Sequence, residues 1–239
     1  SDVIMYKTFI TTGIFESDLA EKIGDVNEFL GKSTLAYLPS YQGVRLRIGA
    51  YAKTKEQAKN EIDRISKIII ERAGQYIVSE DDIKLAQIVG EELNKSKMTI
   101  AVAESCTGGL LGKEITDIPG SSAYFLGGII SYSNEAKIKL LGVNRKTLDD
   151  YGAVSEQTAM EMASNVRTIF NSTYGISITG IAGPDGGTQT KPVGTVWIGI
   201  SNEKTTYARL FNFGEIREVN RERAVGMALT LLLQSLKTI

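Results

Sequence analysis

Three short segments of this chain carry residue types that could do chemistry together. They are residues 105–109 (SCTGG), 132–137 (YSNEAK) and 180–187 (GIAGPDGG). A serine hydroxyl such as that of Ser105 becomes a nucleophile only when a base takes its proton. The sequence contains no histidine, so the base expected is a lysine kept neutral by burial or by neighbouring charge. Lys137 and Tyr132 are the candidates, because they lie at the end of a predicted strand, as Ser105 does.

The residue counts exclude several kinds of active site. Without histidine there is no Ser-His-Asp triad, no Cys-His pair and no His-ligated zinc, and the single cysteine, Cys106, cannot form a thiolate cage. One cysteine also excludes an intrachain disulfide and fits a reducing compartment. We therefore expect neither a metal nor a cofactor, although carboxylates could still bind Mg²⁺.

Each of the three segments also has a purely structural interpretation. Ser105 or Thr107 could cap a helix, with Gly108 and Gly109 allowing close packing. The 180–187 segment could be a surface turn, and lysines such as Lys137 are usually solvated. What favours a site is that two glycine-rich loops follow two strands of one domain, where open α/β sheets bind ligands. Together they predict a small polar ligand.

Charge and hydropathy limit the partners. The 239 residues include 27 Lys and Arg against 28 Asp and Glu, a net charge of −1. This balance does not favour nucleic acid, and neither a membrane span nor a signal peptide is found in the sequence. We expect a cytoplasmic protein with no nucleic-acid or membrane partner.

The elements that must position these residues fall into two parts. Residues 1–80 predict a small α+β domain, with strands at 6–14, 44–48 and 76–78, a helix at 17–30 capped by Ser17, and a helix that Thr54 caps. Residues 81–239 predict a larger α/β domain. Its strands are expected at 98–103, 125–132, 175–179, 193–201 and 205–213, and its helices at 107–116, 134–141, 155–170 and 216–236.

The last two strands predict a hairpin across Asn202 and Glu203. A hairpin added to strands that alternate with helices makes the sheet mixed. The expected fold is thus a three-layer α/β/α domain with a mixed sheet, preceded by the small α+β domain.

Five segments, in order, closely resemble one known family. They are residues 103–109 (AESCTGG), 132–137 (YSNEAK), 152–155 (GAVS), 179–187 (TGIAGPDGG) and 191–196 (KPVGTV). This set resembles the CinA C-terminal domain, the nicotinamide mononucleotide amidohydrolase family. Residues 13–17 (GIFES) and 38–41 (LPSY) resemble the small KH-like domain that precedes it in full-length CinA proteins.

The resemblance implies hydrolysis of nicotinamide mononucleotide to nicotinic acid mononucleotide and ammonia, in recycling to NAD, by a homodimer. By position it implies Ser105 as nucleophile, Lys137 as general base and Tyr132 as an assisting hydroxyl. Further residues match positions around the substrate: Thr107, Gly108, Gly109, Asn134, Thr179, Gly180, Gly183 and Arg221.

Two departures from the family pattern limit what the resemblance implies. The N-terminal molybdopterin-binding-like domain, linked to a metal-dependent ADP-ribose pyrophosphatase activity, is not in this sequence, so that activity is not expected here. The KH-like part has no G-x-x-G, the loop with which KH domains hold nucleic acid. A scaffold or interface role is expected for it.

Two alternatives remain open. Cys106 could be the nucleophile, because a helix N-terminus can lower a thiol pKa. From another functional class, the domain could bind nucleotides or regulate without turnover, with Lys137 pairing with phosphate.

Overall fold

A computed structural model describes residues 3–237. The chain divides into two compact units between Ile88 and Val89, and each is described by itself. In the described residues, no helix combines the length and the hydropathy needed to cross a bilayer.

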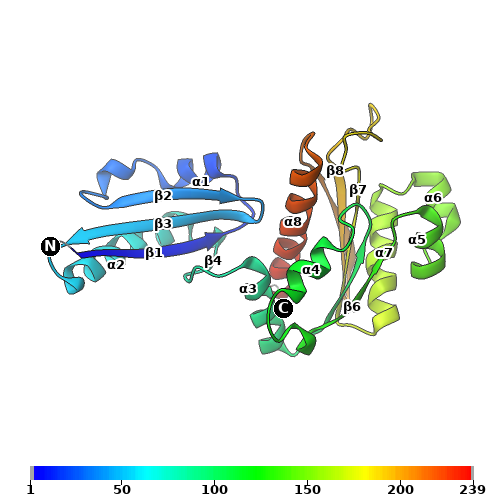
Figure 1. Ribbon diagram of the computed structural model, residues 1–239, viewed down its shortest axis with the longest axis horizontal. Helices are drawn as coiled ribbons and strands as arrows, with labels where there is room; N and C mark the ends of the chain where they lie inside the picture. Colours follow the sequence, from blue (N-terminus) through cyan, green and yellow to red (C-terminus); the bar gives the residue numbers. More distant parts are fainter. Residues whose placement is uncertain (1–2, 238–239) are drawn as a thin grey trace. The chain divides into compact units, whose positions relative to one another are not determined.

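The first unit is an antiparallel sheet covered by two helices (Figure 1). Its elements are β1 (Val3–Thr11), α1 (Glu16–Ile23), β2 (Thr34–Ser40), β3 (Gly43–Ala52), α2 (Lys55–Ala73) and β4 (Ile77–Ser79), with 3₁₀ turns at Val26–Glu28 and Gly74–Tyr76. The strand order is β2-β3-β1-β4. Apolar side chains of α1 and α2, such as Leu19 and Ile65, pack against Phe9 of β1 and Leu46 of β3 and so bury one face of the sheet.

The first unit corrects three details of the sequence prediction. The helix expected at 17–30 ends at Ile23, because Gly24 turns the chain with a φ of 77°. Ser17 does not cap it, since the N-cap is Phe15. The edge strand β2 was not predicted. Thr54 caps α2 as expected, because its hydroxyl accepts a hydrogen bond from the Gln57 N–H.

The second unit contains a five-stranded sheet in the order β6-β5-β7-β8-β9. Helix α3 (Leu85–Ser96) spans the division between the units. The elements that follow are β5 (Ile100–Glu104), α4 (Leu110–Thr116), a 3₁₀ turn (Ser121–Ala123), β6 (Phe125–Ile130), α5 (Asn134–Leu141), α6 (Arg145–Tyr151), α7 (Glu156–Phe170), β7 (Tyr174–Gly180), β8 (Thr195–Ser201), β9 (Thr206–Asn212) and α8 (Arg217–Lys237). The sheet is mixed, since β5 pairs in parallel with β6 and β7 while β7, β8 and β9 are antiparallel.

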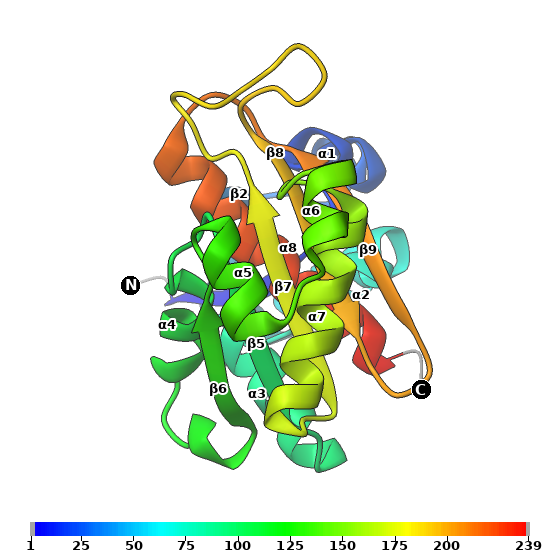
Figure 2. The same cartoon turned by 90° about the vertical axis from the view of Figure 1, so that its right-hand side faces the viewer.

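Helices cover both faces of this sheet, which confirms the three-layer α/β/α prediction. Figure 2 looks onto the face covered by α5, α6 and α7, while α4 and α8 lie on the other face (Figure 1). Ala101 and Ala103 of β5 pack under Leu141, Met162 and Val166. The small alanines let the helix layer approach the strand whose end carries Ser105.

The hairpin is confirmed, and its connection is longer than expected. Residues 202–205 join β8 to β9, and the Asn202 side chain accepts hydrogen bonds from the N–H groups of Lys204 and Thr205. Helix α6 was not predicted. Its N-cap is Asn144, which accepts a hydrogen bond from the Lys146 N–H.

Candidate active site

Three parallel strands bring the sequence motifs to one edge of the sheet. Glu104, the last residue of β5, lies between Ile130 of β6 and Ile178 of β7. Because these strands run in parallel, the segments that begin at Ser105, Ser131 and Ile181 leave the sheet on the same side.

Ser105 and Lys137 are in hydrogen-bond contact at this edge. Lys137 Nζ lies 3.0 Å from Ser105 Oγ and 2.7 Å from the carbonyl oxygen of Ser131. Ser105 is 8% exposed and Lys137 is 1% exposed. The lysine is placed by the start of α5, where Ser133 Oγ accepts a hydrogen bond from the Ala136 N–H. Lys137 lies on the buried face of that first turn.

Burial changes the acid–base chemistry of the lysine. It lowers the pKa of Lys137 from 10.5 to about 8, because an ammonium ion is poorly solvated there. About one molecule in ten then carries the neutral amine at pH 7, against fewer than about one in a thousand for a solvated lysine. The site can therefore supply a base near neutral pH.

The pKa of Cys106 is shifted in the direction that makes the residue less reactive. Burial raises the pKa of its thiol to about 11, despite the nearby positive charge of Lys137. A helix N-terminus can lower a thiol pKa, but the pKa of Cys106 is raised. A protonated, buried thiol is a poor nucleophile, so burial favours Ser105 over Cys106 as the nucleophile.

The loop after Ser105 is a separate turn rather than the start of a helix. Gly108 and Gly109 have φ values of 60° and 98°, in the left-handed region that favours glycine, and α4 begins only at Leu110. The Glu104 carboxylate accepts hydrogen bonds from the N–H groups of Gly109, Leu111 and Gly112. These three N–H groups therefore bind Glu104 and do not face a ligand.

Tyr132 lies beside an arginine. Its hydroxyl is 3.2 Å from Nη2 of Arg217, and the side chain is 61% exposed. Nη1 of Arg217 donates to the carbonyl oxygen of Gly183 at 2.8 Å. Within residues 3–237, the hydrogen bond of the Tyr132 hydroxyl is thus to Arg217 and not to Ser105 or Lys137. Arg217 links the Tyr132 segment to the second glycine-rich loop.

Arg221 contacts the loop that carries Ser105. Its Nη2 donates to the carbonyl oxygen of Thr107 at 2.8 Å. Thr107 is fully buried, and within the described chain neither its Oγ1 nor the buried Nε of Arg221 has a hydrogen-bond partner. Two polar atoms that lack partners beside the serine indicate where a polar ligand could bind.

The remaining predicted residues have structural contacts of their own. Thr179 Oγ1 donates to the carbonyl oxygen of Ala153, which joins two of the sequence motifs. A Cβ on Gly180 would lie 2.7 Å from Val196, and one on Gly183 would lie 2.5 Å from Val193. Close packing therefore explains these two glycines without a ligand. Asn134 is exposed as the first residue of α5.

Comparison with known proteins identifies the family. A model of the CinA C-terminal domain matches residues 82–236, and one of the damage-inducible protein CinA KH domain matches residues 6–79. The chain belongs to the CinA family. A CinA-like protein of Salinibacter ruber is 44% identical over 227 residues, covering 95% of this chain and 55% of the relative. One of Chloroherpeton thalassium is 44% identical over 238 residues, covering 98% and 57%.

A solved CinA-family structure agrees with the fold. The competence/damage inducible protein CihA of Agrobacterium tumefaciens is 36% identical with a TM-score of 0.62, covering 64% of this chain and 93% of that one. The chain spans just over half the length of the curated CinA-like relatives that it matches.

Sequence reasoning missed four residues that organise this CinA site: Glu104, Ser131, Arg217 and Asn220. Asn220, 1% exposed, donates to the carbonyl oxygens of Ala182 and Gly214 and so holds the second glycine-rich loop. The spacing 217, 220 and 221 puts three polar side chains on one face of α8. That pattern could have indicated the contact.

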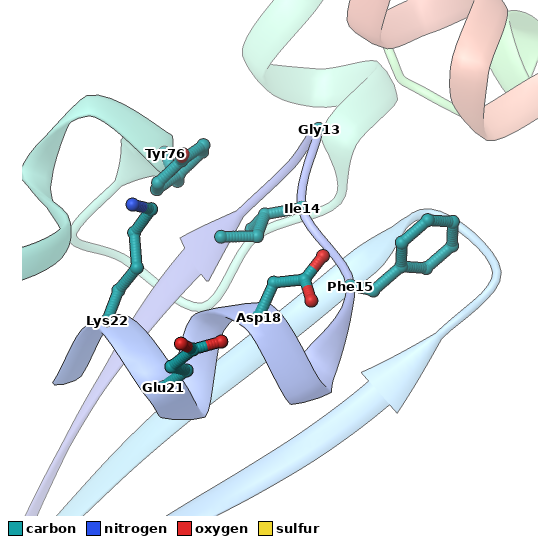
Figure 3. Close-up of a pocket in the computed structure, with 7 residues that line it drawn as sticks. All are labelled: Gly13, Ile14, Phe15, Asp18, Glu21, Lys22 and Tyr76. Carbon is teal, nitrogen blue, oxygen red and sulfur yellow. The ribbon is translucent and has the colours of Figure 1, made fainter. Parts of the chain in front are cut away.

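A separate cavity of about 610 Å³ lies in the first unit (Figure 3). Its lining is Gly13, Ile14, Phe15, Asp18, Glu21, Lys22 and Tyr76. All belong to the KH-like part of this CinA chain, so the cavity is not part of the serine–lysine site. Across residues 3–237, no group of three or more His, Cys, Asp or Glu side chains is placed to hold a metal ion.

Proposed function

We propose that this CinA-family chain deamidates nicotinamide mononucleotide, releasing nicotinic acid mononucleotide and ammonia, with Ser105 as nucleophile and Lys137 as general base. The observation that carries the proposal is the 3.0 Å contact between Lys137 Nζ and Ser105 Oγ in a buried setting. Burial lowers the lysine pKa to about 8, as a base working near neutral pH requires.

In the first half of the reaction, the neutral Lys137 amine takes the proton of the Ser105 hydroxyl while Oγ attacks the carboxamide carbon. The carbonyl π electrons move to oxygen and form a tetrahedral oxyanion. When the carbonyl re-forms, the C–N bond breaks, and the ammonium of Lys137 returns its proton to the leaving nitrogen as ammonia departs. The product is an ester on Ser105.

In the second half, a water molecule attacks the ester and Lys137 again takes a proton. Collapse of that tetrahedral species releases the carboxylic acid and returns a proton to Ser105 Oγ. Each half uses the same lysine as base and then as acid, so proton movements balance without another titrating group.

The developing oxyanion needs hydrogen-bond donors. The N–H groups of Gly109, Leu111 and Gly112 bind Glu104. Those of Cys106 and Thr107, which follow the nucleophile directly, are not among the three. We assign the oxyanion to these two N–H groups, in the loop to which Arg221 is hydrogen-bonded through the Thr107 carbonyl oxygen.

The test is turnover of nicotinamide mononucleotide by the purified chain, with ammonia and nicotinic acid mononucleotide both measured. Equal amounts of the two products support the proposal, and Ser105→Ala serves as the control that should form neither. Tight nucleotide binding without ammonia release would instead show a binding or regulatory module.

A further inference from the structure

Glu104 is an acidic side chain at the centre of the site. It is 1% exposed and stands directly before Ser105 at the end of β5. One carboxylate oxygen accepts hydrogen bonds from the Gly109 and Leu111 N–H groups, each at 3.1 Å, and the other accepts one from Gly112 at 2.8 Å. Three N–H donors compensate for the burial of a carboxylate.

These bonds replace an ordinary helix cap. The N-cap of α4 is Gly109, which has no side chain to satisfy the first N–H groups of the helix. Glu104 satisfies them from the end of the preceding strand. The five residues between strand and helix, Ser105–Gly109, are thus closed into a loop by one side chain.

The main chain of Glu104 also positions the lysine. Its carbonyl oxygen accepts a hydrogen bond from the Ser131 N–H at 2.8 Å. The carbonyl oxygen of Ser131 in turn accepts a hydrogen bond from Lys137 Nζ at 2.7 Å. Glu104 therefore helps to position both Ser105 and Lys137. Its side chain holds the loop that contains Ser105, and its backbone holds the Ser131 carbonyl group to which Lys137 is hydrogen-bonded.

We propose that Glu104 is a positioning residue that keeps Ser105 Oγ aligned with Lys137 Nζ. This inference rests on the proposed serine–lysine chemistry. A carboxylate is required because all three of its partners are donors, and an amide would turn an NH₂ group toward at least one of them. A displacement of about 1 Å at the nucleophile can cost a factor of about 100 in rate.

The decisive variant is Glu104→Gln, which keeps size and shape while removing one acceptor. We expect kcat to fall at least about tenfold with KM within about threefold, because the loss is in alignment rather than in binding. Glu104→Asp keeps the charge with a shorter reach and should retain more activity than the glutamine variant. The matched control is Glu114→Gln on α4, which forms an ion pair with the exposed Lys113; its kcat should not change.

A second readout separates this proposal from the proposed function. A fluorophosphonate probe labels a reactive serine whatever the natural substrate is, and mass spectrometry locates the label. Labelling of Ser105 should be at least about tenfold slower in Glu104→Gln and unchanged in Glu114→Gln. If the wild type is labelled but does not hydrolyse nicotinamide mononucleotide, the substrate assignment fails and the role of Glu104 stands.

Three results would overturn the positioning role. One is a folded glutamine variant with wild-type kcat and labelling rate, which would show that Glu104 only stabilises the fold. Another is the combination of two findings: the glutamine variant fails to fold, and the aspartate variant folds and reacts at the wild-type rate. The third is a wild type whose Ser105 is never labelled, since there would then be no nucleophile to position.

Discussion

Lys137 Nζ donates a hydrogen bond to the carbonyl oxygen of Ser131, six residues earlier in the chain, at 2.7 Å. This acceptor can hold an N–H of the lysine in either protonation state. In the neutral amine, one N–H of Lys137 stays hydrogen-bonded to the Ser131 carbonyl oxygen, and the nitrogen lone pair can face Ser105 Oγ at 3.0 Å. The same fixed geometry can therefore accept a proton from the serine and give it back.

The first prediction is that deamidation rises with pH through an apparent pKa near 8. The lysine pKa is about 8, and only the neutral amine can take the serine proton. kcat should increase about tenfold per pH unit well below 8 and level off above it. Steady-state rates between pH 6 and 9.5 measure this. A profile that is flat below pH 8 would contradict it.

The second prediction is that Lys137→Arg is nearly inactive although it keeps the positive charge. A guanidinium stays protonated and cannot act as the base. Lys139→Arg is the control, because it makes the same change on the exposed side of α5 and should leave turnover intact. Near-normal turnover of the Lys137 variant would make Lys137 an anchor for substrate phosphate, and the base would then have to be Tyr132 or a carboxylate.

The third prediction separates two neighbouring nucleophiles. Ser105→Ala should abolish deamidation while nucleotide affinity stays within about tenfold, because the serine is needed only in turnover. Cys106→Ala should retain most activity, since burial keeps the thiol protonated with a pKa of about 11. Ammonia release and equilibrium binding are measured for both. An active serine variant beside a dead cysteine variant would refute the serine mechanism.

The sequence predicted the larger architecture because its strands and helices are marked by apolar periodicity. Strand β5 and helices α5 and α7 are close to their predicted ranges. Strand β2 was missed since it is an edge strand with little buried surface and a proline, Pro39. Helix α6 was missed because it has only seven residues.

The candidate site was predicted only in part, for a physical reason. The motifs named Ser105 and Lys137, and the structure brings them to hydrogen-bond distance, while their catalytic roles stay predictions. The environment of the lysine could not be predicted, since lysines are seldom buried and Lys137 is 1% exposed. The contacts of Glu104 depend on strand register, which local patterns do not encode. For Arg217, the spacing of residues 217, 220 and 221 indicates a polar face of α8 but not which loop that face contacts.

The fourth prediction is that EDTA leaves deamidation intact. The chemistry derived above needs a serine, a lysine and N–H donors, and none of its steps uses a metal ion. The measurement is ammonia release before and after dialysis against EDTA, with Mg²⁺ added back. Activity lost on dialysis and restored by the metal would show that carboxylates bind a required ion.

The fifth prediction concerns stability, and it follows from the same lysine. With a pKa of about 8 in the folded chain and an ordinary 10.5 when unfolded, Lys137 is protonated in both states below pH 8. Between pH 8 and 10.5 the unfolded chain holds one more proton, so the free energy of unfolding rises with pH in that window. The lowered pKa corresponds to a loss of about 3 kcal/mol in the free energy of unfolding below pH 8, where the buried lysine is an ammonium ion.

Comparison with Lys137→Met isolates this effect. Methionine leaves the Ser131 carbonyl without its donor at every pH, so the informative quantity is how the stability difference between wild type and variant changes with pH. Urea unfolding at pH 7 and at pH 10 should show the wild type gaining about 2–3 kcal/mol on the variant. The same comparison with Lys139→Met should show a constant difference, because that side chain is exposed. A Lys137→Met difference that is equally constant would mean that the ammonium is well solvated in the folded chain, and Lys137 could not then be the base.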